Sequence, residues 1–213
     1  MDGVIFAGEV DIRVIEEFRK QSIPVVLVNN YLDMDGLVCI SADHYGGAVQ
    51  ATEYLCKLGH CKIGLLSGRF SPQVSEARIE GFVKTLAKYD IPVDDRFIAD
   101  IEPALEDGEE IMTRMLREVD RPTAFFCTND TIAAGAMKAV TRAGLRVPED
   151  IAIIGFDDSY ISRVVEPELT TVRIDAAKMG CLAMQTLFDL IAGMPVEKAH
   201  IQIPTELIVR GTA

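Results

Sequence analysis

Polar side chains follow the apolar runs of this sequence at nearly every point where a buried strand would end. These segments are Asn29-Asn30, Ser41-Ala42-Asp43, Ser67-Gly68-Arg69, Asp100, Thr128-Asn129-Asp130 and Asp157-Asp158. In open parallel sheets, ligands bind beyond the carboxyl ends of the strands. Because Asp, Asn and Arg can each form two hydrogen bonds with paired hydroxyls, this set suits a neutral polyhydroxylated ligand better than an anion.

Several of these polar residues also have a purely structural explanation. Asp43, Asp130 and Asp175 stand where helices begin and could serve as N-caps, which is the interpretation we favour for Asp43 and Asp175. Asn129 and Asp157 end buried strands without being obvious caps. For these two residues the sequence therefore favours a ligand contact.

Arg78 and the histidines are the remaining groups that could do chemistry. Arg78 lies beside the apolar face of its helix, so it must reach either solvent or a carboxylate or ligand at the sheet edge, and the sequence leaves both open. His44 follows a probable cap, which predicts a solvated residue in a first helical turn. His60 stands in a helix-to-strand connection, where a structural hydrogen bond is expected.

The motifs of common enzymes and metal sites are missing. There is no phosphate-binding Gly-x-x-x-x-Gly-Lys-Ser/Thr loop, no Gly-x-Gly-x-x-Gly after a strand, no His-Glu-x-x-His and no Gly-x-Ser-x-Gly. Cys56, His60 and Cys61 have no second Cys/His pair at a zinc-type spacing. Asp157 and Asp158 could imitate an acid/base pair, but adjacent residues tend to point in different directions. We therefore predict no catalytic residues, no metal and no cofactor.

Composition narrows the class further. The 213 residues suffice for one large or two small domains, and 49% of them are hydrophobic. A net charge of −12 argues against a stand-alone nucleic-acid-binding protein. No apolar run approaches the roughly 20 residues of a membrane span, and the start lacks a signal-peptide layout, so we expect a cytoplasmic protein without membrane contact. The five scattered cysteines fit reduced thiols.

Short apolar runs alternate with amphipathic stretches, which indicates an α/β fold with parallel sheets flanked by helices. The predicted strands are Gly3–Phe6, Pro24–Val28, Leu37–Ile40, Lys62–Leu66, Arg96–Ala99, Thr123–Cys127, Ile151–Phe156 and Thr170–Ile174. Gly144 is predicted to end the helix Thr131–Ala143, and Asp107 with Glu110 to cap another helix. Before Asp43 there are too few units for a complete lobe, because a βαβ unit takes roughly 30 residues.

Several longer segments resemble the ligand-binding region of LacI-type transcriptional regulators. They are DGVIF (2–6), IPVVLVNN (23–30), LGHCKIGLLSG (58–68), ARIEGF (77–82), RPTAFFCTNDTIAAGAMKAV (121–140), GLRVPEDIAIIGFDD (144–158), PELTTVRID (167–175) and IPTELIVR (203–210). The similarity covers essentially the whole chain in the family's order, and the segments are jointly specific.

The resemblance implies a two-lobed fold like that of type I periplasmic binding proteins, with the effector between the lobes. By this template, residues 1–42 and 168–204 form an incomplete N-terminal lobe, and residues 43–167 and 205–213 form the C-terminal lobe. The helix-turn-helix domain of such regulators is absent from this chain. The implied function is effector sensing and dimerisation, with operator DNA bound only through the absent domain.

The resemblance also implies which residues contact the effector, expected to be a sugar or a related small molecule. Transferred motif by motif, they are Arg78, Asn129, Asp157 and Ile101. In the loop before Arg78, Pro72 and Val74 stand where some members place polar contacts, and Ser71, Gln73 and Ser75 could substitute for these. Ile101 stands where an aromatic side chain often stacks on the effector, and an aliphatic residue offers no π face there. Two alternatives remain at this stage: a sugar-binding protein of a transporter, and a small enzyme that uses Asp157 or Asp158.

Overall fold

The computed structural model describes residues 1–30, 32, 34, 36–196 and 199–213. The predicted N-terminal lobe includes residues 31, 33, 35, 197 and 198, which lie outside the described residues. The chain divides into two compact units. Unit 1 comprises Met1–Asp43 and Asp175–Pro204, and unit 2 comprises His44–Ile174 and Thr205–Ala213.

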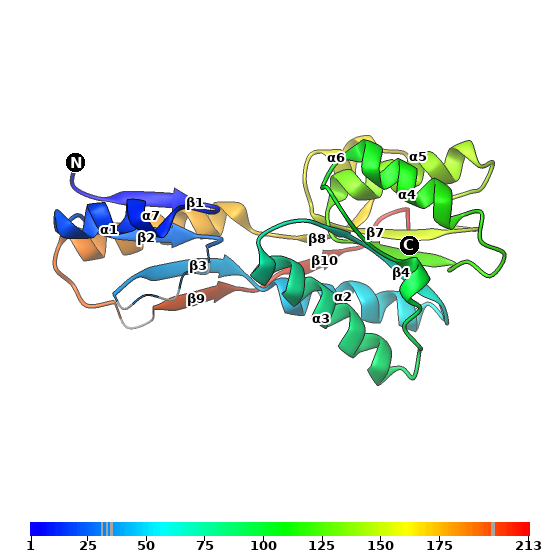
Figure 1. The fold of residues 1–213 in the computed structure, drawn as a ribbon, viewed down its shortest axis with the longest axis horizontal. Coiled ribbons are helices and arrows are strands. Elements are labelled where there is room, and N and C mark those ends of the chain that lie inside the picture. Colours follow the sequence, from blue (N-terminus) through cyan, green and yellow to red (C-terminus); the bar gives the residue numbers. More distant parts are fainter. Residues whose placement is uncertain (31, 33, 35, 197–198) are drawn as a thin grey trace. The chain divides into compact units, whose positions relative to one another are not determined.

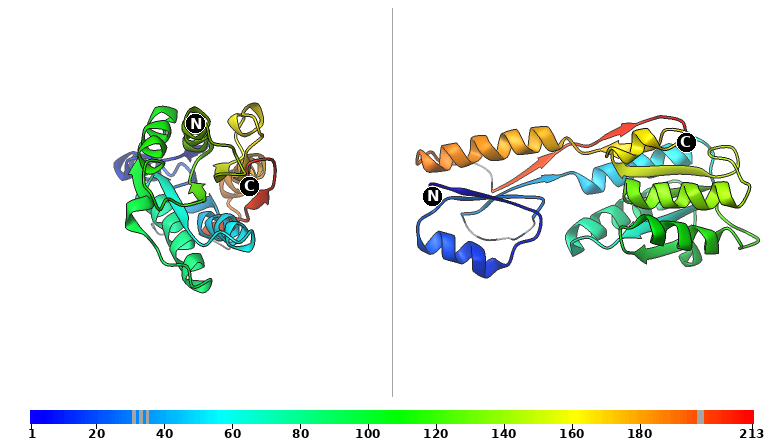
Figure 2. Two further views of the ribbon diagram at one scale, coloured as in Figure 1. Left: turned by 90° about the vertical axis from the view of Figure 1, so that its right-hand side faces the viewer. Right: turned by 90° about the horizontal axis from the view of Figure 1, so that it is seen from above.

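Unit 1 is built on a parallel sheet with strand order β1-β2-β3-β9. The strands are β1 (Val4–Ala7), β2 (Val25–Val28), β3 (Val38–Ala42) and β9 (His200–Ile203). Helix α1 (Ile12–Lys20) and helix α7 (Ala176–Ile191) cover opposite faces of this sheet, dark blue and orange in Figure 2. Ile15 of α1 is fully buried in one apolar cluster with Val25 and Leu27 of β2 and Cys39 of β3.

Unit 2 contains a six-stranded sheet of order β10-β8-β7-β6-β4-β5. Its strands are β4 (Ile63–Gly68), β5 (Ile98–Ile101), β6 (Ala124–Cys127), β7 (Ala152–Asp157), β8 (Thr170–Arg173) and β10 (Glu206–Ile208). All neighbours pair in parallel except β10, which runs antiparallel to β8. The carboxyl ends of β4, β5, β6 and β7 therefore lie along one edge, where a ligand site is expected.

Helices cover both faces of this second sheet (Figure 1). They are α2 (His44–Lys57), α3 (Pro72–Lys88), α4 (Leu105–Met115), α5 (Asp130–Arg142) and the short α6 (Ile161–Val164), with a 3₁₀ turn at Asp95–Phe97. Helices α2 and α3 bury Leu55 and Phe82 in one apolar cluster, whereas α4 and α5 bury Met112 and Ile132 in another. Because β6 has apolar side chains on both faces, it belongs to both clusters.

The α/β fold with parallel, helix-flanked sheets is confirmed, and Gly144 ends α5 with a φ of 74°, a left-handed conformation that suits glycine. Three details differ. Arg96 lies in the 3₁₀ turn, so β5 starts only at Ile98. Helix α4 starts at Leu105, which leaves Asp107 inside its first turn rather than at its cap. The segments β9 and β10 were not predicted as strands.

The position of β8 also differs from the sequence-based lobe boundaries. Residues 168–174 were expected in the N-terminal lobe, but Thr170–Arg173 pairs in register with β7 on one side and β10 on the other. These ladder hydrogen bonds hold the segment in unit 2. The chain passes into unit 1 only at Asp175.

Candidate functional site

Three of the predicted site residues meet at the carboxyl edge of the unit 2 sheet. Asp157 ends β7, Asn129 follows β6, and Arg78 lies on α3. Arg78 Nη2 donates a hydrogen bond to Asp157 Oδ1 over 3.2 Å, and Asn129 Nδ2 donates to Asp157 Oδ2 over 3.2 Å. The two carboxylate oxygens of Asp157 are therefore each held by a different partner.

The question that the sequence left open for Arg78 is answered by its surroundings. The side chain is 3% exposed, so it does not extend to solvent and instead pairs with Asp157. Arg78 Nη1 donates to the backbone oxygen of Thr128. The guanidinium carbon lies 3.9 Å from the Phe156 ring centre and 4.9 Å from that of Phe70, distances typical of cation–π contacts.

Asn129 has two roles, and the expectation that it is not a cap was wrong. Its Oδ1 accepts hydrogen bonds from the backbone N–H groups of Thr131 (2.7 Å) and Ile132 (3.1 Å), so Asn129 is the N-cap of α5. Asparagine is among the best N-cap residues. Its amide nitrogen remains directed at Asp157, which fixes the orientation of the amide.

Asp157 combines an unusual backbone with a partly open side chain. Its φ is 105°, in the left-handed region that few residues other than glycine, asparagine and aspartate occupy. The side chain is 30% exposed. Burial raises the pKa of this carboxyl, while the Arg78 charge and the hydrogen bonds from Asn129 and Arg78 act in the opposite direction.

The other three predicted contacts lie in different surroundings. Ser71 is the N-cap residue of α3, and its buried Oγ has no hydrogen-bond partner among the described residues. Gln73 is exposed in the first turn of α3. Ile101 is 7% exposed and packs in the cluster of α4 and α5. An effector contact of Ser71, Gln73 or Ile101 stays a prediction.

His44 is buried against Arg78, although it was predicted to be solvated. It begins α2, is 3% exposed, and its Nδ1 lies 3.2 Å from Arg78 Nη2. Burial, together with the Arg78 charge, lowers the pKa of His44 to about 3. The available signal was its position directly beyond a predicted strand and Ser41-Ala42-Asp43, the same criterion that identified Asn129 and Asp157.

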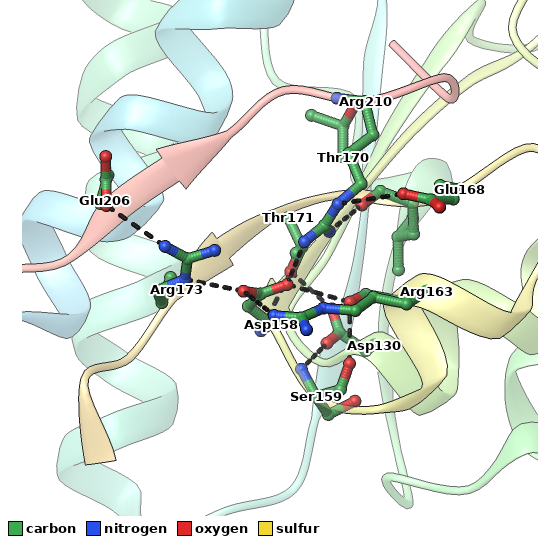
Figure 3. A network of polar contacts seen from close by, with 12 residues as sticks. Asp130, Asp158, Ser159, Arg163, Glu168, Thr170, Thr171, Arg173, Glu206 and Arg210 are labelled. Carbon is green, nitrogen blue, oxygen red and sulfur yellow. Dashed lines mark hydrogen bonds and ion pairs between the residues drawn. The ribbon is translucent and has the colours of Figure 1, made fainter. Parts of the chain in front are cut away.

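The neighbouring Asp158 lies in a second polar network, shown in Figure 3. Its side chain is 2% exposed and pairs with three arginines from different segments. They are Arg163 of α6 (3.6 Å), Arg173 at the end of β8 (2.7 Å) and Arg210 beyond β10 (2.5 Å). Burial alone would raise the pKa of Asp158, but hydrogen bonds from Arg210, Arg173 and Ser162 outweigh it and lower the pKa to about 2.

A third buried carboxylate, Asp130, joins α5 to β8 (Figure 3). Thr171 Oγ1 donates to it over 2.5 Å, and the backbone N–H of Ser159 donates over 2.6 Å. Asp130 is thus the first residue of α5 and not its cap. Burial raises its pKa to about 6, although these hydrogen bonds lower it in part.

The structural explanations of two further residues are confirmed. Asp175 caps α7, with Oδ1 accepting from the backbone N–H of Lys178 over 2.8 Å. His60 forms the expected structural hydrogen bond, with Nδ1 2.8 Å from Thr123 Oγ1. Asp43 directly precedes α2, and its capping role stays a prediction.

Two features are absent from the described part of the chain. It contains no group of three or more His, Cys, Asp or Glu side chains placed to hold a metal ion. In the same residues, no helix has the length and apolar character needed to cross a bilayer.

Comparison with known proteins gives consistent matches. Residues 52–213 match the model of the periplasmic binding protein-like domain. Over 211 residues the chain is 35% identical to the probable HTH-type transcriptional repressor ExuR of Bacillus subtilis. The aligned region covers 98% of this chain but 63% of that protein. This chain therefore spans less than two thirds of the relative's length.

Two solved structures share the fold over almost the whole chain. A regulatory protein of the LacI family from Chloroflexus aggregans has a TM-score of 0.91 at 31% identity, with 100% of this chain and 76% of that one covered. A LacI family transcriptional regulator from Enterococcus faecium with bound ribose has a TM-score of 0.89 at 27% identity, with 99% and 79% covered.

Proposed function

Because this chain belongs to the periplasmic binding protein-like domain family, with the LacI-type resemblance confirmed, we propose that it is the effector-sensing region of a transcriptional regulator. The effector in this proposal is a neutral polyhydroxylated molecule such as a sugar. Asp157, Asn129 and Arg78 orient it from unit 2. The Bacillus subtilis relative is named a probable transcriptional repressor and the Chloroflexus aggregans protein a regulatory protein, which favours sensing over transport or catalysis.

The observation that carries the choice of ligand is the environment of Asp157. Its side chain is 30% exposed, and its carboxylate is held in place by one cation and one amide. The pair of Arg78 and Asp157 has no net charge, and the neutral His44 adds none. A fixed carboxylate accepts hydrogen bonds from hydroxyl groups, whereas it would repel an anionic ligand.

The remaining partners belong to the same proposal. The protein acts as a homodimer in the cytoplasm and binds operator DNA through a helix-turn-helix domain outside this sequence. Effector binding then shifts the population between DNA-binding states, with a coupling free energy of about 1–3 kcal/mol, typical of allosteric proteins. The ribose bound to the Enterococcus faecium regulator supports a sugar as effector class.

The test is a binding screen by isothermal titration calorimetry. The panel contains neutral sugars, including ribose, together with purine bases and inorganic phosphate. We expect at least one neutral sugar to bind the wild-type chain unchanged and in stoichiometric amount, and to bind the Asp157→Asn variant much more weakly. Binding of phosphate alone, or equal sugar affinity in both proteins, would contradict the proposal.

A further inference from the structure

His44 is the residue of α2 that contacts the guanidinium of Arg78. Both side chains are 3% exposed. His44 Nδ1 and Arg78 Nη2 are 3.2 Å apart, and the imidazole ring centre lies 6.0 Å from that of Phe156, the ring that Arg78 also contacts. His44, Arg78 and Phe156 therefore form one packed group beside Asp157.

The chemistry of the two side chains fixes the direction of this hydrogen bond. A guanidinium has only donors, so His44 Nδ1 must be the acceptor. The imidazole proton then lies on Nε2. Since burial and the Arg78 charge lower the pKa of His44 to about 3, the ring is neutral near pH 7 and keeps its lone pair available.

The hydrogen bonds of Arg78 show what this acceptor achieves. Nη2 carries two N–H groups, of which one is directed at His44 and the other at Asp157 Oδ1. Nη1 donates to the Thr128 backbone oxygen. Three acceptors in different directions fix the plane of the guanidinium. His44 is therefore one of the acceptors that hold Nη2 in its orientation toward Asp157.

We propose that His44 is a positioning residue of the effector site, where it acts as a neutral acceptor that directs Arg78 Nη2 at Asp157. The proposal rests on the function proposed above, because it assigns His44 to the same site. It requires no contact between His44 and the effector. The tautomer of His44 and the titration of Asp157 can therefore test it in the protein without any ligand.

Three variants separate the role of the acceptor from a general role in folding. His44→Asn keeps an oxygen acceptor at about the place of Nδ1, whereas His44→Leu has a similar volume and no acceptor. Thr52→Val is the matched control: Thr52 is a fully buried polar residue of the same helix, and its hydroxyl bonds to the Ala48 backbone oxygen.

The first measurement is ¹⁵N NMR of the histidines in the wild-type chain at pH 7. We expect the signals of His44 to show an unprotonated Nδ1 and a protonated Nε2. A proton on Nδ1 would overturn the proposal, since that nitrogen could not then accept from Arg78. This result does not depend on whether a variant folds.

The second measurement is the titration of the Asp157 carboxyl by ¹³C NMR in the ligand-free variants. We expect His44→Leu to raise its midpoint by about half a pH unit or more, because a less ordered Arg78 stabilises the carboxylate less. His44→Asn and Thr52→Val should stay close to wild type. An unchanged midpoint in His44→Leu would overturn the proposal.

The third measurement uses whichever neutral sugar binds the wild-type chain in the calorimetric screen. His44→Leu should weaken binding about tenfold, and His44→Asn less than about threefold. Equal losses in both variants would show that the acceptor is not what matters. If no sugar binds the wild type, the proposed function fails, while the two NMR measurements still decide the role of His44.

Discussion

Asp157 and Asp158 are adjacent in the chain, yet they lie in opposite environments. Asp157 is 30% exposed, and one arginine and one asparagine hold it. Asp158 is 2% exposed and pairs with three arginines. The pKa of the Asp157 carboxyl is raised by burial, whereas the arginines lower that of Asp158 to about 2.

The two environments indicate different roles, a structural one for Asp158 and a ligand-binding one for Asp157. Asp158 joins segments that are distant in the sequence, because Arg173 ends β8 and Arg210 follows β10. Glu168 and Glu206 pair with the same two arginines, so the charges of the network are largely balanced (Figure 3). The side chain of Asp157, in contrast, is partly exposed. One residue thus holds the strands, and its neighbour remains available to a ligand.

The largest effect is expected from removing the charge of Asp158. Asp158→Asn removes the buried anion that the largely buried Arg210 shares with two more exposed arginines, and breaking a buried ion pair typically costs about 3–5 kcal/mol of stability. Urea denaturation would measure the free energy of unfolding. A loss below about 1 kcal/mol would show that the arginines do not depend on this carboxylate.

Asp157→Asn should affect sugar affinity more than Asp158→Asn does, and stability less. Its amide keeps one oxygen acceptor for Arg78, but the buried guanidinium loses its paired charge, so we expect the free energy of unfolding to fall by about 1–3 kcal/mol. Sugar affinity should fall by a factor of about ten or more, because a charged acceptor is replaced by a neutral one. Calorimetry and urea denaturation of the same preparation check both parts. A stability loss as large as that of Asp158→Asn would make Asp157 a structural residue.

A third expected effect concerns pH and involves His44 and Asp130. The pKa of His44 is about 3 in the folded protein, against an ordinary value near 6.5. Between these two pH values His44 is protonated only in the unfolded chain, so its contribution to stability falls as pH decreases. Asp130 has a folded pKa of about 6 against 3.8, so stability from this residue rises as pH decreases through that window. Each slope is at most about 1.4 kcal/mol per pH unit, and between pH 4 and 6 they oppose each other.

Single variants should separate the two contributions. We expect His44→Asn to gain stability relative to wild type as pH falls from 6 to 4, and Asp130→Asn to lose it. At each pH, subtracting the free energy of unfolding of the wild type from that of a variant removes the contributions of the titratable groups that both proteins share. Parallel stability curves for all three proteins would contradict the two pKa shifts.

The smallest effect is expected at Asn129. Asn129→Asp keeps the N-cap oxygen of α5 but replaces the donor that faces Asp157 by an acceptor, whereas Asn129→Ala removes both. We expect Asn129→Ala to cost about 1 kcal/mol of stability, and Asn129→Asp to cost less while further raising the pKa of Asp157. Thermal unfolding and ¹³C titration of Asp157 would check these outcomes.

The sequence predicted most of the unit 2 sheet because its strands are continuous apolar runs, such as Ala124–Cys127. It did not predict β9 and β10. His200–Ile203 alternates polar and apolar residues over only four positions, and Glu206–Ile208 has three. Segments this short become strands through their neighbours, here β3 and β8.

The same limit applies to the candidate site. The position of Asn129 and Asp157 after strands indicated polar residues at a ligand edge, and the structure brings them together with Arg78. The burial of His44 depends on α3 and β7 packing around α2, which no local pattern reveals. Likewise, the amide of Asn129 both caps α5 and bonds to the carboxylate of Asp157. This double role depends on the tertiary arrangement of β6, β7 and α5, so the sequence alone did not predict it.

The backbone at the end of β7 restricts how this protein could change its ligand. Asp157 and Asp158 have φ values of 105° and 52°, where β-branched and bulky side chains are strained. Among single substitutions at Asp157, asparagine and glycine fit this conformation best. A single substitution that this backbone tolerates at Asp157 therefore removes one negative charge. Larger changes in the shape of the site must come from residues on the surrounding helices and loops.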